Sequence, residues 1–123
     1  MAIAAHIYNP PQDNGITVLS EAYVASYTPD IRSGNNLLIT MTLTGNITIA
    51  NAVNATEGAE FTFRFLQDAT GGRTISWGSA YRGSNDTSLP STTSTANSTD
   101  YFAFKYNSVS SKADFVAPNK GFL

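Results

Sequence analysis

The chain of 123 residues contains no cysteine and a single histidine. Without cysteine it forms no disulfide and no thiolate metal site, so its sequence carries no sign of an oxidising or reducing compartment. His6 stands alone in a proline-bounded N-terminal segment, where an isolated imidazole is typical of a solvated surface side chain rather than a general base. We therefore expect no metal and no cofactor.

Charge is also scarce. Charged residues make up 13% of the chain and the formal net charge is −2, whereas about a quarter of the residues in an average globular domain are charged. A chain without a basic excess is a poor partner for nucleic acid or for an anionic membrane. Such an uncharged polar surface instead suits packing against other proteins, because a hydroxyl group costs less to desolvate than an ion.

Long hydrophobic runs are missing as well. No apolar stretch approaches the ~18 residues that a membrane-spanning helix needs. The opening "MAIAAHIYNPP" lacks the basic residues of a signal peptide, and Pro10 and Pro11 end its short apolar run. We expect a soluble product assembled in the cytoplasm of a cell.

The acidic residues give little support to catalysis. They are scattered singly along the chain, and no His-x-His, Glu-x-x-His or oxygen-ligand loop occurs. A glycosidase would require two of these carboxyl groups to meet in the folded chain, about 5–10 Å apart. We expect a protein that is not an enzyme.

Alternation of apolar and polar residues predicts an all-β fold. In "EFTFRFLQ" the side chains of Phe61, Phe63 and Phe65 share one face, and Thr62 and Arg64 share the other. "NLLITMTLTGNITIA" and "DYFAFKYN" alternate in the same way, and no segment has a helical stripe. Shorter candidate strands are 16–19, 23–27, 74–77 and 112–116.

The spacing of these strands favours a single antiparallel β-sandwich or jelly-roll-like domain. We expect its body to span residues 34–123. Residues 1–33 contain Pro10, Pro11 and Pro29 with sparse apolar side chains, a pattern typical of an extended N-terminal arm. Twelve of the seventeen residues from Ser84 to Asp100 are Ser, Thr or Asn, which predicts a long surface loop with room for an edge strand.

The stretch "QDATGGRTISWGSAYR" has the glycines of a phosphate loop but lacks its spacing, its lysine and a following helix. A β-hairpin corner explains it better. Gly71 and Gly72 supply positive φ, Asp68 or Thr70 caps the turn, and Arg73 pairs with an acid such as Asp68 or covers an aromatic ring.

Four segments in order, "LTGNITIAN", "NATEGAEFTFRFLQDATGGRTISWGSAYR", "STANSTDYFAFKYN" and "NKGF", resemble a β-rich module of tailed-bacteriophage virion proteins. That module often forms the C-terminal end of tail fibres. The resemblance covers about residues 37–122, implies a structural or attachment role in the virion, and brings no catalytic residues.

Within that family, a short module preceded by an arm is similar in plan to capsid decoration, or cement, proteins. This implies a homotrimer on the capsid surface that binds the major capsid protein through its arm. The apolar side chains of the arm are then the shell or subunit contacts: Ile3, Ile7, Tyr8, Val18, Leu19, Tyr23 and Tyr27.

The alternative is a tail-fibre or baseplate adhesin that binds a host glycan or receptor. Its candidate contacts are Trp77, Tyr81 and Arg82, because aromatic faces stack on sugar rings and a guanidinium binds hydroxyl or carboxylate groups. Burial tendencies favour a different arrangement, in which Trp77 packs in the core and Tyr81 covers its rim.

Overall fold

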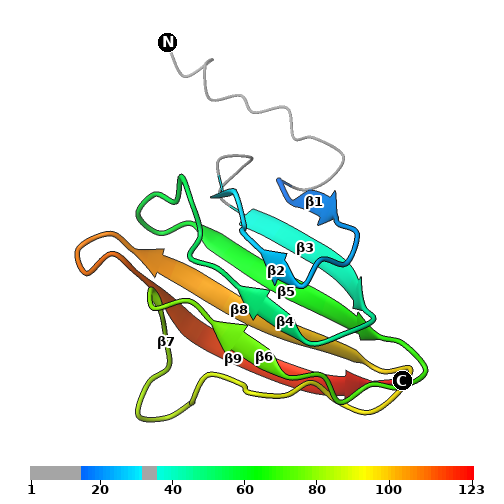
Figure 1. The fold of residues 1–123 in the computed structure, drawn as a ribbon. Helices are drawn as coiled ribbons and strands as arrows, with labels where there is room; N and C mark the ends of the chain where they lie inside the picture. The colour runs from blue at the N-terminus through cyan, green and yellow to red at the C-terminus, as the bar shows by residue number, and fades with distance from the viewer. Residues whose placement is uncertain (1–14, 32–35) are drawn as a thin grey trace.

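The computed structural model describes residues 15–31 and 36–123, which form nine β-strands (Figure 1). The strands are β1 (Thr17–Ser20), β2 (Ser26–Tyr27), β3 (Asn36–Leu43), β4 (Ile47–Ile49), β5 (Glu60–Gln67), β6 (Ile75–Trp77), β7 (Tyr81–Arg82), β8 (Thr99–Asn107) and β9 (Lys112–Phe122). This confirms the all-β prediction. Over the described ranges no helix has the length and apolar character needed to cross a membrane.

The strands form two sheets that face each other. The six-stranded sheet has the order β1-β3-β5-β8-β9-β7, and the three-stranded sheet has the order β2-β4-β6. Figure 1 shows the smaller sheet in front of the larger one. From β1 to β6 the chain alternates between the two sheets. Each pair of successive strands makes one turn, and the next pair stacks on it. The arrangement is a short two-sheet solenoid of three turns.

Most of the pairing in this stack is parallel, which corrects the expectation of an antiparallel sandwich or jelly roll. Among the described strands, five of the seven pairs are parallel, and only β5·β8 and β8·β9 are antiparallel. Alternation in a sequence tells which face of a strand is buried, but it is the same for either strand direction. The alternation from which the fold was predicted therefore contained no information on strand direction.

The glycine stretch is a corner between the sheets rather than a hairpin, because β5 lies in the larger sheet and β6 in the smaller one. Its local chemistry is as predicted. Gly71 and Gly72 have φ values of 65° and 59°. The Asp68 carboxylate accepts hydrogen bonds from the amides of Thr70 and Gly71, both at 3.0 Å, and pairs with Arg73.

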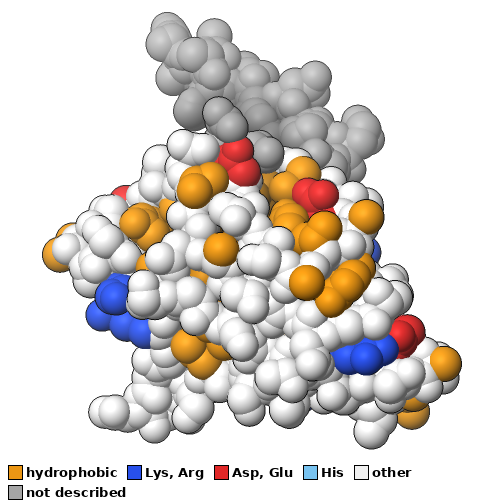
Figure 2. All heavy atoms as spheres, in the orientation of Figure 1, with side chains coloured by type: hydrophobic (Ala, Val, Ile, Leu, Met, Phe, Trp, Pro, Cys, Tyr) orange, Lys and Arg blue, Asp and Glu red, His pale blue; other side chains and the backbone are white. Residues whose placement is uncertain are grey.

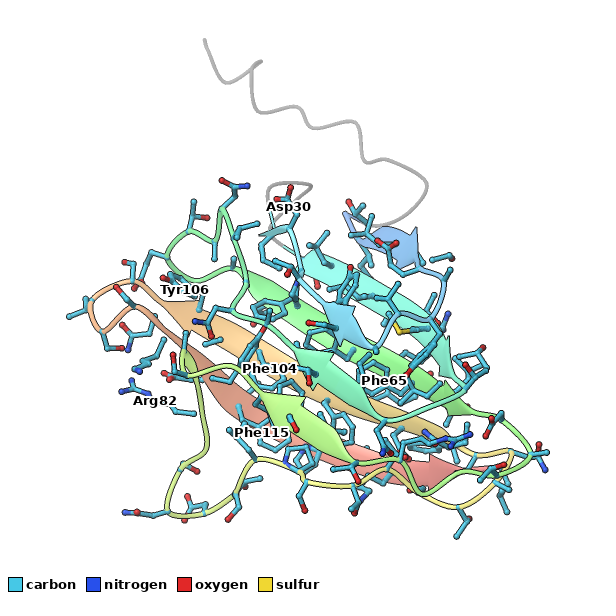
Figure 3. All side chains as sticks on the ribbon, in the orientation of Figure 1. Asp30, Phe65, Arg82, Phe104, Tyr106 and Phe115 are labelled. Atoms are coloured by element: carbon cyan, nitrogen blue, oxygen red, sulfur yellow. The ribbon has the colours of Figure 1, made fainter. Side chains whose placement is uncertain are left out.

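The hydrophobic core lies between the two sheets. Phe61, Phe63 and Phe65 are each 0% exposed, as their alternation predicts. Phe65, Phe104 and Phe115 lie between the sheets in Figure 3. On the side of the smaller sheet, Ile49 is fully buried. The core is thus an aromatic layer from the larger sheet packed against aliphatic side chains of the smaller one.

Part of the expected N-terminal arm belongs to this body. β1 pairs with β3 over four residues, and β2 pairs with β4. Leu19 and Tyr27 are half-buried against the core. Short strands with few apolar residues have little pattern of their own, and their stability comes from the neighbours on which they stack. Residues 1–14 and 32–33 of the expected arm lie outside the described part of the chain.

The Ser/Thr/Asn-rich segment forms a long connection, as predicted, and part of it covers the edge of β6. The amide of Ile75 donates to the carbonyl of Ser91 at 2.9 Å, and the amide of Thr93 donates to the carbonyl of Arg73 at 2.8 Å. Isolated bridges join Thr74 to Thr92 and Gly71 to Thr95. The segment thereby pairs the backbone groups of an edge that would otherwise be open.

The two faces of β5 allow a direct test of this packing. Replacing Phe63 with alanine should lower the free energy of unfolding by about 3–5 kcal/mol, because the ring is fully buried among other aromatic rings. The matched change Thr62→Ala, on the outer face of the same strand, should cost far less. Urea denaturation monitored by tryptophan fluorescence measures both, and equal losses would contradict the assignment of the faces.

Candidate functional site

Two of the three residues predicted to contact a ligand pack at the core, Tyr81 within it and Trp77 half-buried against it. Tyr81 is 4% exposed, and its hydroxyl donates to the carbonyl of Ala50 at 2.8 Å. The indole Nε1 of Trp77 donates to the carbonyl of Pro90 at 2.7 Å. The two rings lie 5.2 Å apart, and that of Trp77 also packs at 5.1 Å from the ring of Phe104.

These contacts hold the Tyr81 ring inside the protein, whereas the Trp77 ring stays half-buried. Burial, with a smaller contribution from Tyr27, raises the pKa of Tyr81 above its ordinary value of 10.0, which keeps the hydroxyl protonated as a donor to Ala50. The packing alternative favoured from burial tendencies holds with the two roles exchanged, because Tyr81 is buried in the core and Trp77 is half-buried against it. Trp77 and Tyr81 tie the corner after β6 to the core.

Arg82 lies at the surface, where β7 pairs with β9. Its Nε donates to Oδ1 of Asp114 at 2.5 Å, and one terminal nitrogen reaches Oγ of Ser110 at 3.1 Å. The hydrogen bond to Asp114 raises the pKa of Arg82, so the guanidinium stays charged. Figure 3 shows Arg82 and Tyr106 at the same end of the molecule.

Beside this ion pair lies a hollow of about 230 Å³, which we call the hairpin-end hollow. Its lining residues are Glu57, Gly58, Lys105, Tyr106, Asn107, Asp114 and Val116. They come from the turn before β5 and from the ends of β8 and β9 that meet at the hairpin. The hollow combines a half-buried aromatic ring, an ammonium group, carboxylates and a side-chain amide, a mixture that suits a polar organic ligand such as a sugar.

Hydrogen bonds hold the walls of the hairpin-end hollow in place. Oε1 of Glu57 accepts the amide of Ser108 at 2.7 Å and its hydroxyl at 3.0 Å. Oδ1 of Asn107 accepts the amides of Val109 and Ser110. Lys105 pairs with Glu60 at 3.5 Å, with more than half of each side chain exposed. The walls are therefore fixed before any ligand arrives, and only the lysine is loosely held.

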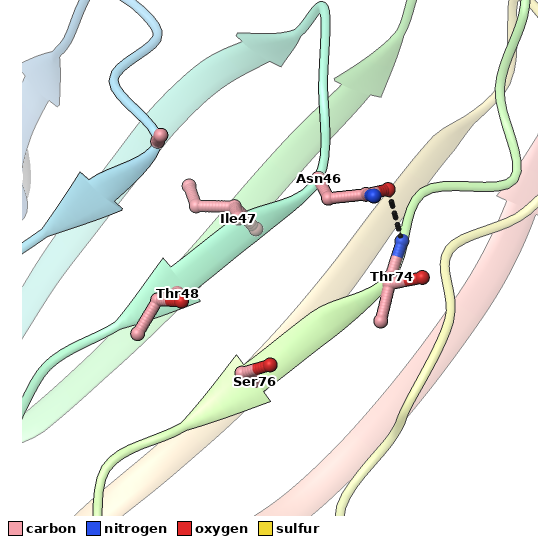
Figure 4. A pocket seen from close by; sticks show the side chains of 6 residues that line it. Asn46, Ile47, Thr48, Thr74 and Ser76 are labelled. Atoms are coloured by element: carbon pink, nitrogen blue, oxygen red, sulfur yellow. Dashed lines mark hydrogen bonds between the residues drawn. The ribbon is translucent and has the colours of Figure 1, made fainter.

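A second hollow, of about 350 Å³, lies over β4 and β6 (Figure 4). Its lining residues are Ala25, Asn46, Ile47, Thr48, Thr74 and Ser76. Oδ1 of Asn46 accepts the amide of Thr74 at 2.9 Å, which links the starts of the two strands. This hollow offers hydroxyl groups without a charged or aromatic side chain. Figure 2 shows the same face largely uncoloured, with charged groups toward its margins.

Some of the predicted shell or subunit contacts lie in the body, and the others lie outside the described residues. Ile3, Ile7 and Tyr8 lie outside the described residues, as does His6. Val18 is 53% exposed on β1, whereas the other three side chains are half-buried against the core: Leu19, Tyr23 and Tyr27. Among the described residues no group of three or more histidine, aspartate or glutamate side chains is placed to hold a metal ion.

The sequence marked the turns that build the hairpin-end hollow, but it did not indicate that they meet. The pairs Glu57-Gly58 and Asn107-Ser108 have the composition of turns. They are 51 positions apart, and they touch only because β5 and β8 pair antiparallel. Tyr106, Lys105 and Glu57 were missed for this reason.

The Glu57–Ser108 contact predicts a pH dependence of stability. The backbone and hydroxyl hydrogen bonds from Ser108 hold the pKa of Glu57 below its ordinary value of 4.5. A carboxyl whose folded-state pKa is lowered stabilises the fold above its unfolded-state pKa, and it loses that contribution as the pH falls through the folded value. Glu57→Gln should therefore lower the urea midpoint at neutral pH, and the gap from the wild type should close well below pH 4.5. A gap that stays constant would contradict the assignment.

Comparison with known proteins gives one family. The family described as "Putative phage tail fibre C-terminal domain" matches residues 27–110, from the end of β2 to the β8–β9 turn. Searches of the curated proteins and of the solved structures returned no match. The matched range holds six complete strands, β3 to β8, and five of the seven residues that line the hairpin-end hollow, all except Asp114 and Val116. The chain belongs to the phage tail fibre C-terminal domain family and is a structural module of a bacteriophage virion.

Proposed function

We propose that this domain is a terminal module of a phage tail fibre and that it binds a glycan or another polar receptor on the host surface. The observation that carries the proposal is the family match over residues 27–110, which spans most of the chain. The structure supports a binding role with a rigid body and a preformed polar hollow. The proposed action is binding, without a chemical step and without a cofactor.

The family match favours the tail over the capsid. Capsid decoration was the first interpretation of the sequence, and it relied on a separate arm that docks on the major capsid protein. The described part of that arm supplies β1 and β2 of the body instead, so it is not available there as a free docking strand. The matched family is described as a tail fibre domain, which supports the alternative interpretation directly.

The hairpin-end hollow is the proposed receptor contact. Tyr106 contributes a ring for stacking on the apolar face of a sugar, and aromatic contacts are frequent anchors of binding sites. Lys105, with a side chain 55% exposed, supplies a mobile donor. Asn107 uses its carbonyl oxygen within the turn and has an amide nitrogen left as a second donor among the described residues. These groups suit hydroxyl and carboxylate groups of a saccharide.

Self-association, expected from the sequence as a homotrimer, is part of this proposal. The outer face of the six-stranded sheet carries exposed apolar side chains on strands far apart in the chain, such as Val18 at 53% and Leu66 at 36%. An extended sheet face with few charges is a suitable surface for contact between copies. Light scattering of the purified chain measures the number of copies directly.

Two measurements on virions test the proposal. Quantitative densitometry should find a handful of copies per particle, as for a fibre component, whereas hundreds of copies would indicate a shell protein. Tyr106→Ala and Lys105→Ala should each slow adsorption to host cells by about tenfold if they remove binding contacts of typical strength. The matched control is Lys120→Ala, which changes a lysine near the other end of β9 that donates to the Thr92 carbonyl.

The two measurements test separately where the protein lies in the virion and which residues contact the receptor. A low copy number with normal adsorption of both hollow variants would leave the fibre assignment in place and reject the hairpin-end hollow as the receptor contact. Melting curves of the purified variants exclude loss of folding as the cause of slow adsorption.

A further inference from the structure

The outer face of the six-stranded sheet, which points away from the smaller sheet in Figure 1, carries an arginine in the middle of β5. Arg64 lies opposite Thr40 of β3 on one side and opposite Tyr101 of β8 on the other. Side chains opposite each other on neighbouring strands lie on the same face of the sheet. The Tyr101 ring meets the ring of Phe122 on β9 edge to face, with the ring centroids 5.7 Å apart. We call these four residues the outer platform.

The charge of Arg64 is oriented but not balanced by an acid. Its Nε donates to Oγ1 of Thr40 at 3.0 Å, and within the described residues its two terminal nitrogens have no partner. The acidic side chain on the same face of β5 is Glu60, four residues or roughly 13 Å away along the strand, and it pairs with Lys105. The other described arginine and lysine side chains are engaged by acids or by backbone carbonyls: Arg73, Arg82, Lys105, Lys112 and Lys120.

An oriented guanidinium of this kind matches a ligand that carries a carboxylate. Arg64 is half-buried, so a charge left without a counter-ion there costs free energy. The guanidinium presents its N–H groups as a planar fork that fits the two oxygens of a carboxylate. Since Thr40 already occupies Nε, the two terminal nitrogens are the pair left for such a contact. A single cation does not suit a nucleic acid, which contacts several basic side chains at once.

The aromatic side chains of the outer platform suit a sugar ring. Phe122 is 53% exposed, and its ring is held by that of Tyr101. An exposed aromatic ring packs well against the apolar face of a sugar. The hydroxyl of Tyr101 forms no hydrogen bond with another described residue, so it can donate to a sugar hydroxyl or accept from one. Beside the arginine there are thus an apolar surface and a polar group for the rest of an acidic sugar.

We propose that the outer platform binds an acidic saccharide, with the carboxylate on the terminal nitrogens of Arg64 and the sugar ring against Phe122. It is a second binding site, apart from the hairpin-end hollow, whose Lys105 lies four residues from Tyr101 along β8. The inference goes beyond the proposed function, because it assigns another place and a charge class of ligand and does not require the hollow to contact a receptor. The β1 side of the face, with Val18, stays available for contact between copies.

Titration of the isotopically labelled chain with galacturonate, followed by NMR, tests this site. The amides of Arg64 and Tyr101 should shift and saturate. At equal ionic strength the same shift should need at least tenfold more galactose, which has a hydroxymethyl group in place of the carboxylate. Arg64→Gln should weaken galacturonate binding by about tenfold, because it removes charge-assisted hydrogen bonds. The matched control Lys120→Gln removes a cation that donates to the Thr92 carbonyl, and it should leave binding unchanged. Melting curves of both variants check that they are folded.

Other results overturn the proposal. A lack of shifts with galacturonate would mean that the outer platform binds no acidic sugar, and equal shifts with galactose would mean that it does not recognise the carboxylate. An equal loss in Lys120→Gln would mean that net charge, rather than Arg64, attracts the sugar.

Two further outcomes would assign the ligand or the platform elsewhere. Shifts confined to Lys105 and Tyr106 would place the acidic sugar in the hairpin-end hollow, which rejects the outer platform and supports the proposed receptor contact. A smaller mass of Arg64→Gln in light scattering, without sugar-induced shifts in the wild type, would mean that a carboxylate of a second copy occupies the platform. Conversely, platform binding together with normal adsorption of the hollow variants rejects only the receptor contact in the hollow.

Discussion

The register between neighbouring strands is the constraint on which this structure depends. Leu37 of β3 lies opposite Phe61 of β5, which lies opposite Phe104 of β8. Two residues further along, Ile39, Phe63 and Phe102 form the next row, and all six side chains are buried. A slip of one residue between any two strands would turn the apolar side chains of one strand to solvent and break every row at once. The aromatic core thus fixes the register, and the register fixes the turns.

The two ends of the stack are built differently. On the other side of β5, the larger sheet continues with the antiparallel strands β8 and β9 and ends with the short strand β7. There Asp100, which is 0% exposed, accepts hydrogen bonds from the amides of Ser94 and Gly121. A buried carboxylate is tolerated where backbone donors replace its lost hydration. It joins the covering loop and the last strand to the sheet. The N-terminal side ends in two short strands, β1 and β2, each paired in parallel with its neighbour and held by few backbone contacts.

Much of the local structure was predictable because it depends on short-range chemistry. Alternation identified the buried face of β5, and the aspartate, the two glycines and the arginine at the 68–73 corner behaved as turn residues do. The direction of pairing was not predictable, since parallel strands are joined by long connections without a recognisable turn. Nor was the assignment of β1 and β2 to the body, because strands of four and two residues contain too little pattern to identify. The hairpin-end hollow was missed because its walls are distant in sequence.

In this solenoid the residues on the surface can differ in chemistry without a change in the fold. Side chains at inward positions must pack in the rows of the core. Side chains at outward positions on the same strands need only suit a pleated strand, and Ser and Thr do so well. This accounts for the low charge and the many hydroxyl groups of the chain. It also places the chemically diverse residues where strands end, at the 56–58 turn and the β8–β9 turn, which no row of the core constrains. Glu57 occupies such a position, whereas Tyr106 is half-buried and packs against the core. The turn residues around the hairpin-end hollow can therefore change more freely than the tyrosine, which links the hollow to the rows that hold the register.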